Sequence, residues 1–221
     1  MSYEVAVILP CRGRFDQTIA YANRLRAAAG NPVAVGVNGF DFVAVGGFED
    51  DDTLQSLAAN GWDVVGSRQP TLTYWEALTV GVANSNAVFF VNVANDLYAR
   101  DRWLEIGLAA YRARWPEEMP ALMGFSGDGH LVGHSCHFLI HRSLIARFGG
   151  WPTHYQHNSG DTELCVRAQG LGVYAKATHA VLEHRHPARS TAPDDAVYAA
   201  GRATWAQDQA LFNARKAAEW I

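Results

Sequence analysis

The chain has 221 residues, of which 49% are hydrophobic and 18% are charged, and its net charge at pH 7 is −4. That length supports a sizeable core in one domain, and the slightly acidic balance excludes a general attraction to nucleic acid or anionic membranes, although it permits a local basic patch. The three cysteines are far apart and lack the paired spacing of a zinc site, so we expect a reducing compartment. Because no signal-peptide pattern and no bilayer-length apolar run are visible, we expect a cytoplasmic protein.

Strand and helix patterns alternate over the first hundred residues. Short apolar runs at residues 5–9, 33–37, 42–45, 63–65 and 87–96 predict buried strands. Apolar residues at helical spacing predict helices over residues 16–28, 49–58 and 75–83. The expected start signals are Asp16 for the first and Thr71 or Thr73 for the third. This alternation predicts an α/β fold with a mostly parallel central sheet flanked by helices.

The second half of the chain has a different pattern. The four glycines within residues 124–133 predict a loop or hairpin, and strands are expected at residues 134–140, 173–177 and 180–183. Helices are expected from Asp101 to before Pro116, over residues 143–148, and from Asp161 to Gly170 or Gly172. Residues 194–221 predict a long C-terminal helix with these side chains facing inward: Val197, Trp205, Leu211 and Phe212. Since no repeat or linker interrupts the chain, we expect a single domain.

Two acidic segments are candidates for chemistry. Asn95 and Asp96 end the apolar run of residues 87–96, and open α/β sheets bind ligands beyond such strand ends. Asp161 and Glu163 begin a predicted helix after a glycine- and histidine-rich approach. Each pair has a structural explanation as well, because Asn and Asp favour turns and caps, and carboxylates favour helix N-termini.

A histidine pair and a basic loop are further candidates. His184 and His186 alternate along a predicted strand and would share one face, where imidazole together with carboxylate suits a divalent ion such as manganese. A solvated pair of histidines on a turn is the alternative. The loop from Pro10 through Arg12 to Arg14 follows the first strand, where a nucleotide base could lodge, or it is an ordinary basic turn. Neither a Walker A motif nor a strand followed by Gly-x-Gly-x-x-Gly is present.

The order of these segments resembles the GT-A-fold glycosyltransferases, in particular family 2, over roughly residues 3–190. The matching pieces are residues 7–10 with Arg14, Asn95-Asp96 with residues 103–104, residues 148–150 followed by residues 161–167, and His184. The Asp-x-Glu-Leu-Cys-x-Arg segment is the most specific piece. Ala94 and Gly160 depart from the family pattern, because acids often stand at these two places.

The resemblance implies a single GT-A-type domain over residues 1–221. It would have a nucleotide-binding half of about residues 1–100, an acceptor and catalytic half of about residues 101–190, and a C-terminal helix of about residues 194–221. Asp96 would bind a divalent metal, Mn²⁺ or Mg²⁺, that bridges the diphosphate of a nucleotide-sugar donor. Asp161 would be the catalytic base, Glu163 would orient the helix start or the acceptor, and His184, less surely His186, would be a second metal ligand.

The same resemblance implies where the nucleoside would bind. Pro10 with Arg12 or Arg14 would contribute from the first loop, and Asn95 from the loop before Asp96. An acidic residue would come from residues 49–52, with Asp50 and Asp51 the main candidates, because the second strand lacks the family's usual Asp-Gly-Ser.

The function implied is that of a metal-dependent, inverting glycosyltransferase of the hexosyltransferase type, with a UDP-sugar as donor. The alternatives are a nucleotidyltransferase acting on a sugar phosphate and a non-catalytic nucleotide- or carbohydrate-binding module. The acceptor could be a glycan, a small molecule or a hydroxymethylated DNA base, and Trp151 and Tyr155 are the expected acceptor-side aromatic residues. A DNA acceptor would need a basic patch, for which the candidates are Arg142, Arg147, Arg185, Arg189 and Arg202.

Overall fold

The computed structural model describes residues 4–115, 119–127, 133–187 and 190–220. One eight-stranded sheet runs through these residues in the order β3-β2-β1-β4-β7-β6-β8-β5. The strands are β1 Val5–Pro10, β2 Phe40–Gly46, β3 Asp63–Gly66, β4 Phe89–Asn92, β5 Leu97–Ala99, β6 Leu122–Ser126, β7 Phe138–His141 and β8 Tyr174–His184. The β1–β2, β1–β4, β2–β3 and β6–β8 pairs are parallel, and β4–β7, β6–β7 and β5–β8 are antiparallel. The expected α/β fold with a mostly parallel sheet is confirmed.

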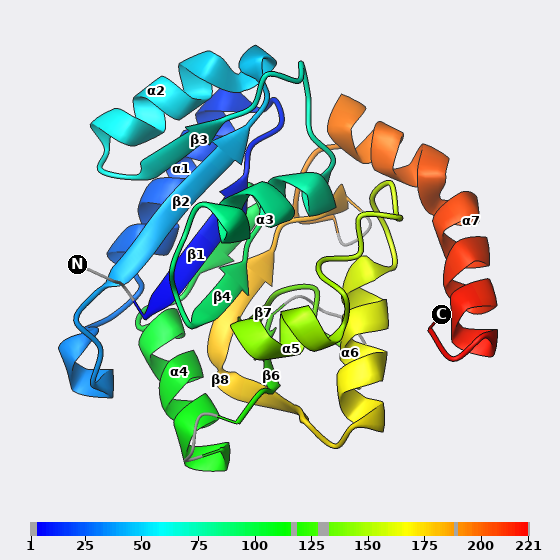
Figure 1. Ribbon diagram of the computed structural model, residues 1–221. Coiled ribbons are helices and arrows are strands. Elements are labelled where there is room, and N and C mark those ends of the chain that lie inside the picture. The colour runs from blue at the N-terminus through cyan, green and yellow to red at the C-terminus, as the bar shows by residue number, and fades with distance from the viewer. Residues whose placement is uncertain (1–3, 116–118, 128–132, 188–189, 221) are drawn as a thin grey trace.

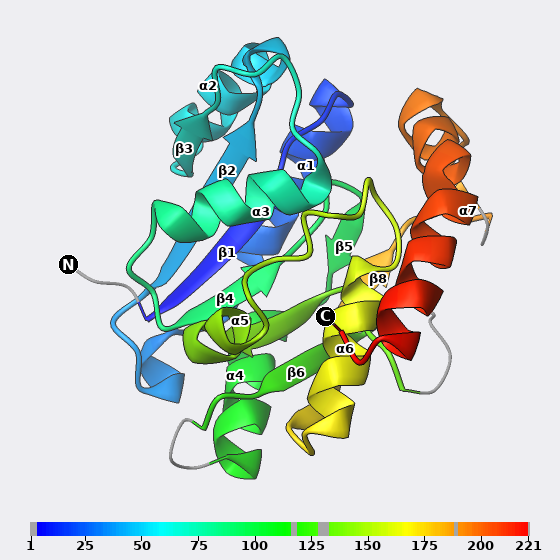
Figure 2. The same cartoon turned by 45° about the vertical axis from the view of Figure 1, so that its right-hand side comes forward.

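Helices cover both faces of this sheet. They are α1 Phe15–Ala27, α2 Asp51–Ala59, α3 Tyr74–Ala83, α4 Trp103–Arg114, α5 Arg142–Arg147, α6 Gly160–Gly170 and α7 Ala196–Ala217, with short 3₁₀ turns at Val33–Val35 and Phe48–Asp50. In Figure 1, α3 crosses in front of the sheet and α1 lies behind it. The C-terminal α7 lies at one side of the sheet, next to α6 (Figures 1 and 2). The expected C-terminal helix is therefore present.

The first strand shows why the central part of the sheet was readable from sequence. All six residues of β1 are buried, which is the state expected of an apolar strand covered on both faces. The helix α3 also begins as predicted, because Thr73 and Glu76 form a capping box in which each side chain binds the other residue's backbone N–H.

Several predicted starts and strands in the first half are wrong. Val33–Val35 form a 3₁₀ turn after Pro32, and Val33 is 74% exposed, so the run of residues 33–37 is not a strand. Asp16 and Asp101 are not caps: the N-cap residues of α1 and α4 are Arg14 and Arg102, both with left-handed backbones. Asp101 instead pairs with Arg24, with 2.6 Å between Arg24 Nη2 and Asp101 Oδ1.

The apolar run of residues 87–96 is also shorter as a strand than predicted. β4 ends at Asn92, and the chain turns at residues 95–96 before entering β5. The side chain of Asn92 explains the end of β4, because its amide donates to Cys136 O and its carbonyl accepts from Phe138 N. The strand is thereby fastened to the segment that leads into β7.

In the second half, three boundaries differ from the prediction. The strands expected at residues 173–177 and 180–183 form one strand, β8 (Tyr174–His184), with a register shift where it passes Phe125 and Ser126 of β6. Gly124 lies within β6, and residues 128–132 of the predicted glycine-rich loop fall outside the described residues. Of the strand expected at residues 134–140, only the part from Phe138 onward is extended in the sheet.

The inward face of α7 differs from the predicted one. Trp205 is 56% exposed, and the buried side of the helix is made by Tyr198, Gly201, Asp208 and Phe212. This face is partly polar because Tyr198 contacts Asp96 and Asp208 contacts the backbone of His157 and Asn158, rather than a second apolar layer. None of the helices in the described residues combines the length and the apolar character that a membrane span requires.

Candidate active site

Strand register brings Asp96 and His184 together. Leu97 of β5 pairs with His184 of β8, and Arg185 N donates to Asp96 O over 2.9 Å. Residues 88 positions apart in the sequence thus become neighbours at the end of this two-stranded ladder. His184 Nε2 lies 3.3 Å from Asp96 Oδ2.

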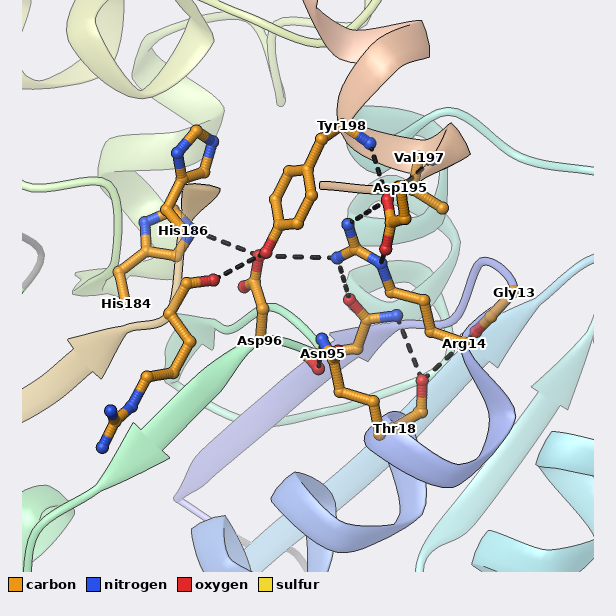
Figure 3. A network of polar contacts seen from close by, with 12 residues as sticks. Gly13, Arg14, Thr18, Asn95, Asp96, His184, His186, Asp195, Val197 and Tyr198 are labelled. Atoms are coloured by element: carbon orange, nitrogen blue, oxygen red, sulfur yellow. Dashed lines mark hydrogen bonds and ion pairs between the residues drawn. The ribbon is translucent and has the colours of Figure 1, made fainter. Parts of the chain in front are cut away.

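The carboxylate of Asp96 is buried and surrounded by three polar side chains, as Figure 3 shows. Tyr198 reaches it from α7 and donates its hydroxyl to Oδ2 over 2.9 Å, and Arg14 Nη1 lies 3.6 Å from the same oxygen. The second oxygen, Oδ1, is buried and has no hydrogen-bond partner among the described residues; the same is true of His184 Nδ1. Asp96 and His184 therefore each keep one buried polar atom uncommitted.

The ionisation of Asp96 follows from these contacts. Burial raises its pKa, but the hydrogen bonds from His184 and Tyr198 and the charge of His184 outweigh burial, and the pKa falls to about 2. Asp96 is consequently an anion at every physiological pH, which a metal ligand requires.

Arg14 joins the first loop to α7. It is the left-handed N-cap of α1, and its guanidinium binds Asp195 with Nε–Oδ2 and Nη2–Oδ1 distances of 2.6 and 2.8 Å. The guanidinium also lies 3.8 Å from the centroid of the Tyr198 ring. Asp195 in turn caps α7 by accepting from Val197 N and Tyr198 N. A charge-assisted pair thus fixes the start of α7 beside the site.

Asn95 supports the same loop. Its Oδ1 lies 3.4 Å from Arg14 Nη1, and its Nδ2 donates to Thr18 Oγ1 over 3.1 Å. Gln17 donates to its backbone oxygen. The side chain of Asn95 is therefore engaged with α1, and it holds the turn from which Asp96 projects.

A cavity of about 340 Å³ opens beyond the end of β1. It is lined by Arg12, Gly13, Glu49, Asp50, Thr71, Ala196, Val197 and Ala200. Asp50 is buried and accepts from Gly13 N through Oδ1, whereas its Oδ2 has no hydrogen-bond partner among the described residues. Burial raises the pKa of Asp50 above its usual value. Asp51 and Asp52 are exposed, and Pro10 is buried at the end of β1.

A second cavity of about 260 Å³ adjoins the first and shares Arg12, Thr71 and Ala200 with it. Its other lining residues are Leu72, Thr73, Glu76, Gln156, His157, Gly201 and Thr204. Burial, together with the charge of Arg12, lowers the pKa of His157. The lining mixes donors with acceptors, which suits a polar, uncharged ligand.

Asp161 is the second residue of α6, and the N-cap is Ser159 with a left-handed backbone, so the expected capping role of Asp161 is wrong. Its Oδ1 accepts from the next backbone N–H, Thr162 N, over 2.8 Å. Burial raises the pKa of Tyr74, and the charges of Asp161 and Asp96 both add to this rise. Both carboxylates also raise the pKa of His157 against the effect of burial. Asp161 and Asp96 therefore lie around one region of the molecule.

Glu163 lies elsewhere on α6 and is fully buried. Its carboxylate accepts from Arg215, Arg167 and Tyr155 and lies 3.3 Å from His154 Nε2. Arg215 belongs to the last turns of α7, so this cluster joins α6 to the far end of that helix. Both oxygens of Glu163 are engaged within the protein.

His186 lies between His184 and Tyr198, with ring centroid distances of 5.3 and 4.8 Å. The ring of His137, on the segment before β7, approaches His184 from another direction at 5.4 Å. Among the described residues, no three His, Cys, Asp or Glu side chains are grouped so that they could hold a metal alone. Any ion at Asp96 and His184 would need further ligands from a substrate or water.

Sequence reasoning missed Tyr198, Asp195 and His137. The N-cap position of Asp195 before a long helix was visible in the sequence as a capping signal. Nothing local indicated that Tyr198 would reach Asp96 or that His137 would approach His184, because both contacts depend on how α7 and β7 pack.

No family model matches the chain, and no curated protein matches its sequence. Solved structures do match. The mannosyltransferase PcManGT from Pyrobaculum calidifontis, in complex with GDP-Man and Mn²⁺, has a TM-score of 0.61 at 12% identity over 82% of this chain and 56% of that one. Glucosyl-3-phosphoglycerate synthase from Mycobacterium tuberculosis, with Mn²⁺, UDP and glucosyl-3-phosphoglycerate, has a TM-score of 0.62 at 16% identity over 83% and 72% of the two chains.

Residues 1–349 of S. aureus TarS, in complex with UDP-GlcNAc, give a TM-score of 0.57 at 14% identity over 82% and 57% of the two chains. The chain thus spans less than three fifths of the mannosyltransferase and of this TarS fragment. At such identities the likeness concerns the fold. The GT-A-type fold implied by the sequence is confirmed.

Proposed function

We propose that this chain is a metal-dependent glycosyltransferase that moves a sugar from a nucleotide-sugar donor to an acceptor hydroxyl. The observation that carries the proposal is the contact between Asp96 and His184. These two residues come from distant segments of the chain, and both were expected to be ligands of the same metal ion. The GT-A-type fold supports it, because the matching structures are complexes with GDP-Man, UDP or UDP-GlcNAc, two of them also with Mn²⁺.

The residues at this point fit a divalent cation. Asp96 Oδ1 and His184 Nδ1 are buried polar atoms without a hydrogen-bond partner among the described residues, and such atoms call for a ligand. Asp96 and His184 would hold the ion, with His186 as the weaker candidate. Carboxylate with imidazole suits manganese, and a bound ion would neutralise charge on the leaving diphosphate.

The donor would lie along the first cavity. Arg12 and Gly13 line it together with Asp50, whose uncommitted oxygen could accept a hydrogen bond from the base or ribose. Arg14, adjacent to both the cavity loop and Asp96, would bind the diphosphate through its guanidinium. We propose a UDP-sugar as the donor.

Asp161 would take the proton of the acceptor hydroxyl. A positioned carboxylate makes a weak hydroxyl nucleophile effective, and attack from the side opposite the leaving diphosphate inverts the anomeric centre. Glu163 would act at a distance, by fixing the start of α6 through its arginine contacts rather than by touching substrate.

The first experiment screens nucleotide sugars for thermal stabilisation in the presence of Mn²⁺ and then follows turnover. We expect stabilisation and released nucleoside diphosphate, both abolished by a chelator. Release of pyrophosphate would instead indicate a nucleotidyltransferase acting on a sugar phosphate. Donor binding without any turnover would indicate a binding module.

The second experiment tests the base. Asp161→Asn should lower turnover about 10² to 10⁴-fold while donor affinity remains, because only proton transfer is removed. Asp52→Asn, on the exposed side of α2, is the control and should be neutral. Full activity in Asp161→Asn would remove this residue from the role.

The acceptor that we propose is a glycan or a small molecule that bears a free hydroxyl. A DNA acceptor gains no support from three of the basic residues named for it, because their guanidinium groups are engaged within the protein. Arg142 donates to the backbone oxygens of Ala87 and Ser85, while Arg185 and Arg202 form ion pairs with Glu183 and Asp194. Arg189 lies outside the described residues. Trp151 and Tyr155 are both buried, so neither offers an open stacking surface.

A further inference from the structure

A buried carboxylate in the middle of α7 holds the segment that leads to Asp161. Asp208 is 1% exposed, and it accepts three backbone hydrogen bonds from consecutive residues. Gln156 N donates to Oδ1 over 2.9 Å, and His157 N and Asn158 N donate to Oδ2 over 3.0 and 2.7 Å. Consecutive N–H groups converging on one anion form a preorganised binding concavity.

The position of this residue argues for a task beyond helix formation. Aspartate is a poor residue for a helix interior, and a buried carboxylate is costly unless it is fully hydrogen-bonded. Here the three loop amides supply those bonds. Asp208 therefore stabilises the loop, and the loop makes its burial possible.

Two further contacts lock the same loop onto α7. Asn158 Nδ2 donates to Gly201 O over 2.8 Å and to Thr204 Oγ1 over 3.2 Å. The His157 ring packs on Gly201 so closely that a Cβ there would lie 2.8 Å from the ring Cδ2. Only glycine leaves room for the ring in this position. The loop is thus held by its backbone and by two of its side chains.

Only two residues separate this locked loop from Asp161, and both are constrained. Ser159 has a left-handed backbone with φ of 68°. Gly160 packs against the Trp75 indole, where a Cβ would lie 2.4 Å from ring atoms. Because Ser159 and Gly160 have little freedom to adjust, a displacement of residues 156–158 would also displace Asp161.

We propose that Asp208 is a positioning residue for sugar transfer. It holds Gln156 and His157, which line the second cavity, and it sets the position of Asp161 at the start of α6. The proposal rests on the function proposed above, with Asp161 as base. It assigns α7 a part in catalysis that goes beyond closing the fold.

Asp208→Asn tests this role, because an amide has one oxygen and leaves at least one loop N–H facing an NH₂ group. We expect the amides of residues 156–158 to exchange hydrogen faster and kcat to fall on the order of 10- to 100-fold, since a misplaced catalytic group costs this much. The KM for the donor and the affinity for Mn²⁺ should not change.

Phe212→Leu is the matched control. Phe212 lies one turn beyond Asp208 in α7 and packs on Trp220, so this variant lowers stability while it leaves the hydrogen bonds of Asp208 in place. It should leave both the amide exchange of residues 156–158 and kcat as in the wild type.

The outcomes separate the two proposals. Normal kcat in Asp208→Asn, or unchanged exchange of the loop amides, defeats the positioning role alone. Loss of kcat to the same extent in Phe212→Leu also defeats it, because general destabilisation would then explain both. A wild-type chain that turns over no donor in any screen defeats the proposed function, and the positioning role with it.

Discussion

Two buried clusters of nearly the same composition connect α7 to the rest of the molecule. At one end, Asp96 is surrounded by Arg14, Tyr198 and His184, and at the other end Glu163 is surrounded by arginines, Tyr155 and His154. The difference lies in how many oxygens are engaged. Both oxygens of Glu163 accept hydrogen bonds, whereas Asp96 Oδ1 has no partner among the described residues.

This difference distinguishes a cluster that only holds helices together from a cluster that can also bind a ligand. A fully satisfied buried network holds elements in one arrangement, and removing one member leaves the others buried and unpaired. A network with one uncommitted oxygen and one uncommitted imidazole nitrogen has capacity left for a ligand. On this basis the Glu163 cluster fastens α6 to α7, and the Asp96 cluster is the one that we propose as the metal site.

The strongest test of the comparison is Asp96→Asn. Turnover should fall on the order of 10³-fold, because the metal's several kcal/mol of charge stabilisation is lost at about 1.4 kcal/mol per tenfold. Mn²⁺ binding by calorimetry should vanish with it. Retained Mn²⁺ binding would place the ion elsewhere.

Glu163→Gln should behave in the opposite way. The free energy of unfolding, measured with urea, should fall by about 3 kcal/mol, because Arg167 and Arg215 lose the charge that both of them contact. Mn²⁺ affinity of the folded fraction should stay as in the wild type. A stable variant that no longer binds Mn²⁺ would reverse the two assignments.

The pH dependence of the free energy of unfolding gives a further test of the Asp96 cluster. The pKa of Asp96 is about 2 in the folded chain against an ordinary 3.8, so its ionised form stabilises the fold above pH 4. That contribution, roughly 2 kcal/mol, is lost as the pH falls through about 2. Urea unfolding between pH 5 and pH 2 should therefore show a steeper loss of stability in the wild type than in Asp96→Asn. Equal slopes would mean that Asp96 is not an ion pair partner in the folded chain.

The smallest expected effects come from the two tyrosines. Tyr198→Phe and Tyr155→Phe each remove one hydrogen bond to a carboxylate and should each lower stability by about 1 kcal/mol. Only Tyr198→Phe should also weaken Mn²⁺ binding, by about tenfold. The Tyr198 hydroxyl donates to Asp96 Oδ2 and so orients the carboxylate that is proposed to bind the ion. A loss of Mn²⁺ affinity in Tyr155→Phe would show that the two clusters are coupled through α7.

The readable parts of the sequence are those in which local chemistry and tertiary environment agree. The strand at residues 5–9 is apolar on both faces because helices cover both faces of the sheet around it. Thr73 and Glu76 form their capping box within four residues, so no distant contact is needed. The residues nominated around the nucleoside, Asp50 and Arg12, also lie together in one cavity.

The errors arise where distant contacts override local preference. Residues 33–37 are apolar but follow Pro32, and the run begins at the exposed Val33 and pairs with no strand among the described residues. Asp101 and Asp161 have strong capping propensity, yet the left-handed residues Arg102 and Ser159 are the N-caps, and both carboxylates make other contacts. Trp205 was expected on the inward face of α7, but it is exposed, and the buried face is the partly polar one that contains Tyr198 and Asp208.

By itself the sequence determined the parallel core, the succession of elements and the identity of the ionisable residues, since these depend on burial period and on side-chain chemistry within a few positions. Only the tertiary structure decided which of those residues meet. The pairing of Leu97 with His184 sets Asp96 beside its imidazole, and the docking of α7 brings Tyr198 and Asp208 to their partners. The reason is physical: register and helix docking are settled by summed contacts across the whole molecule, and no short stretch of chain encodes them.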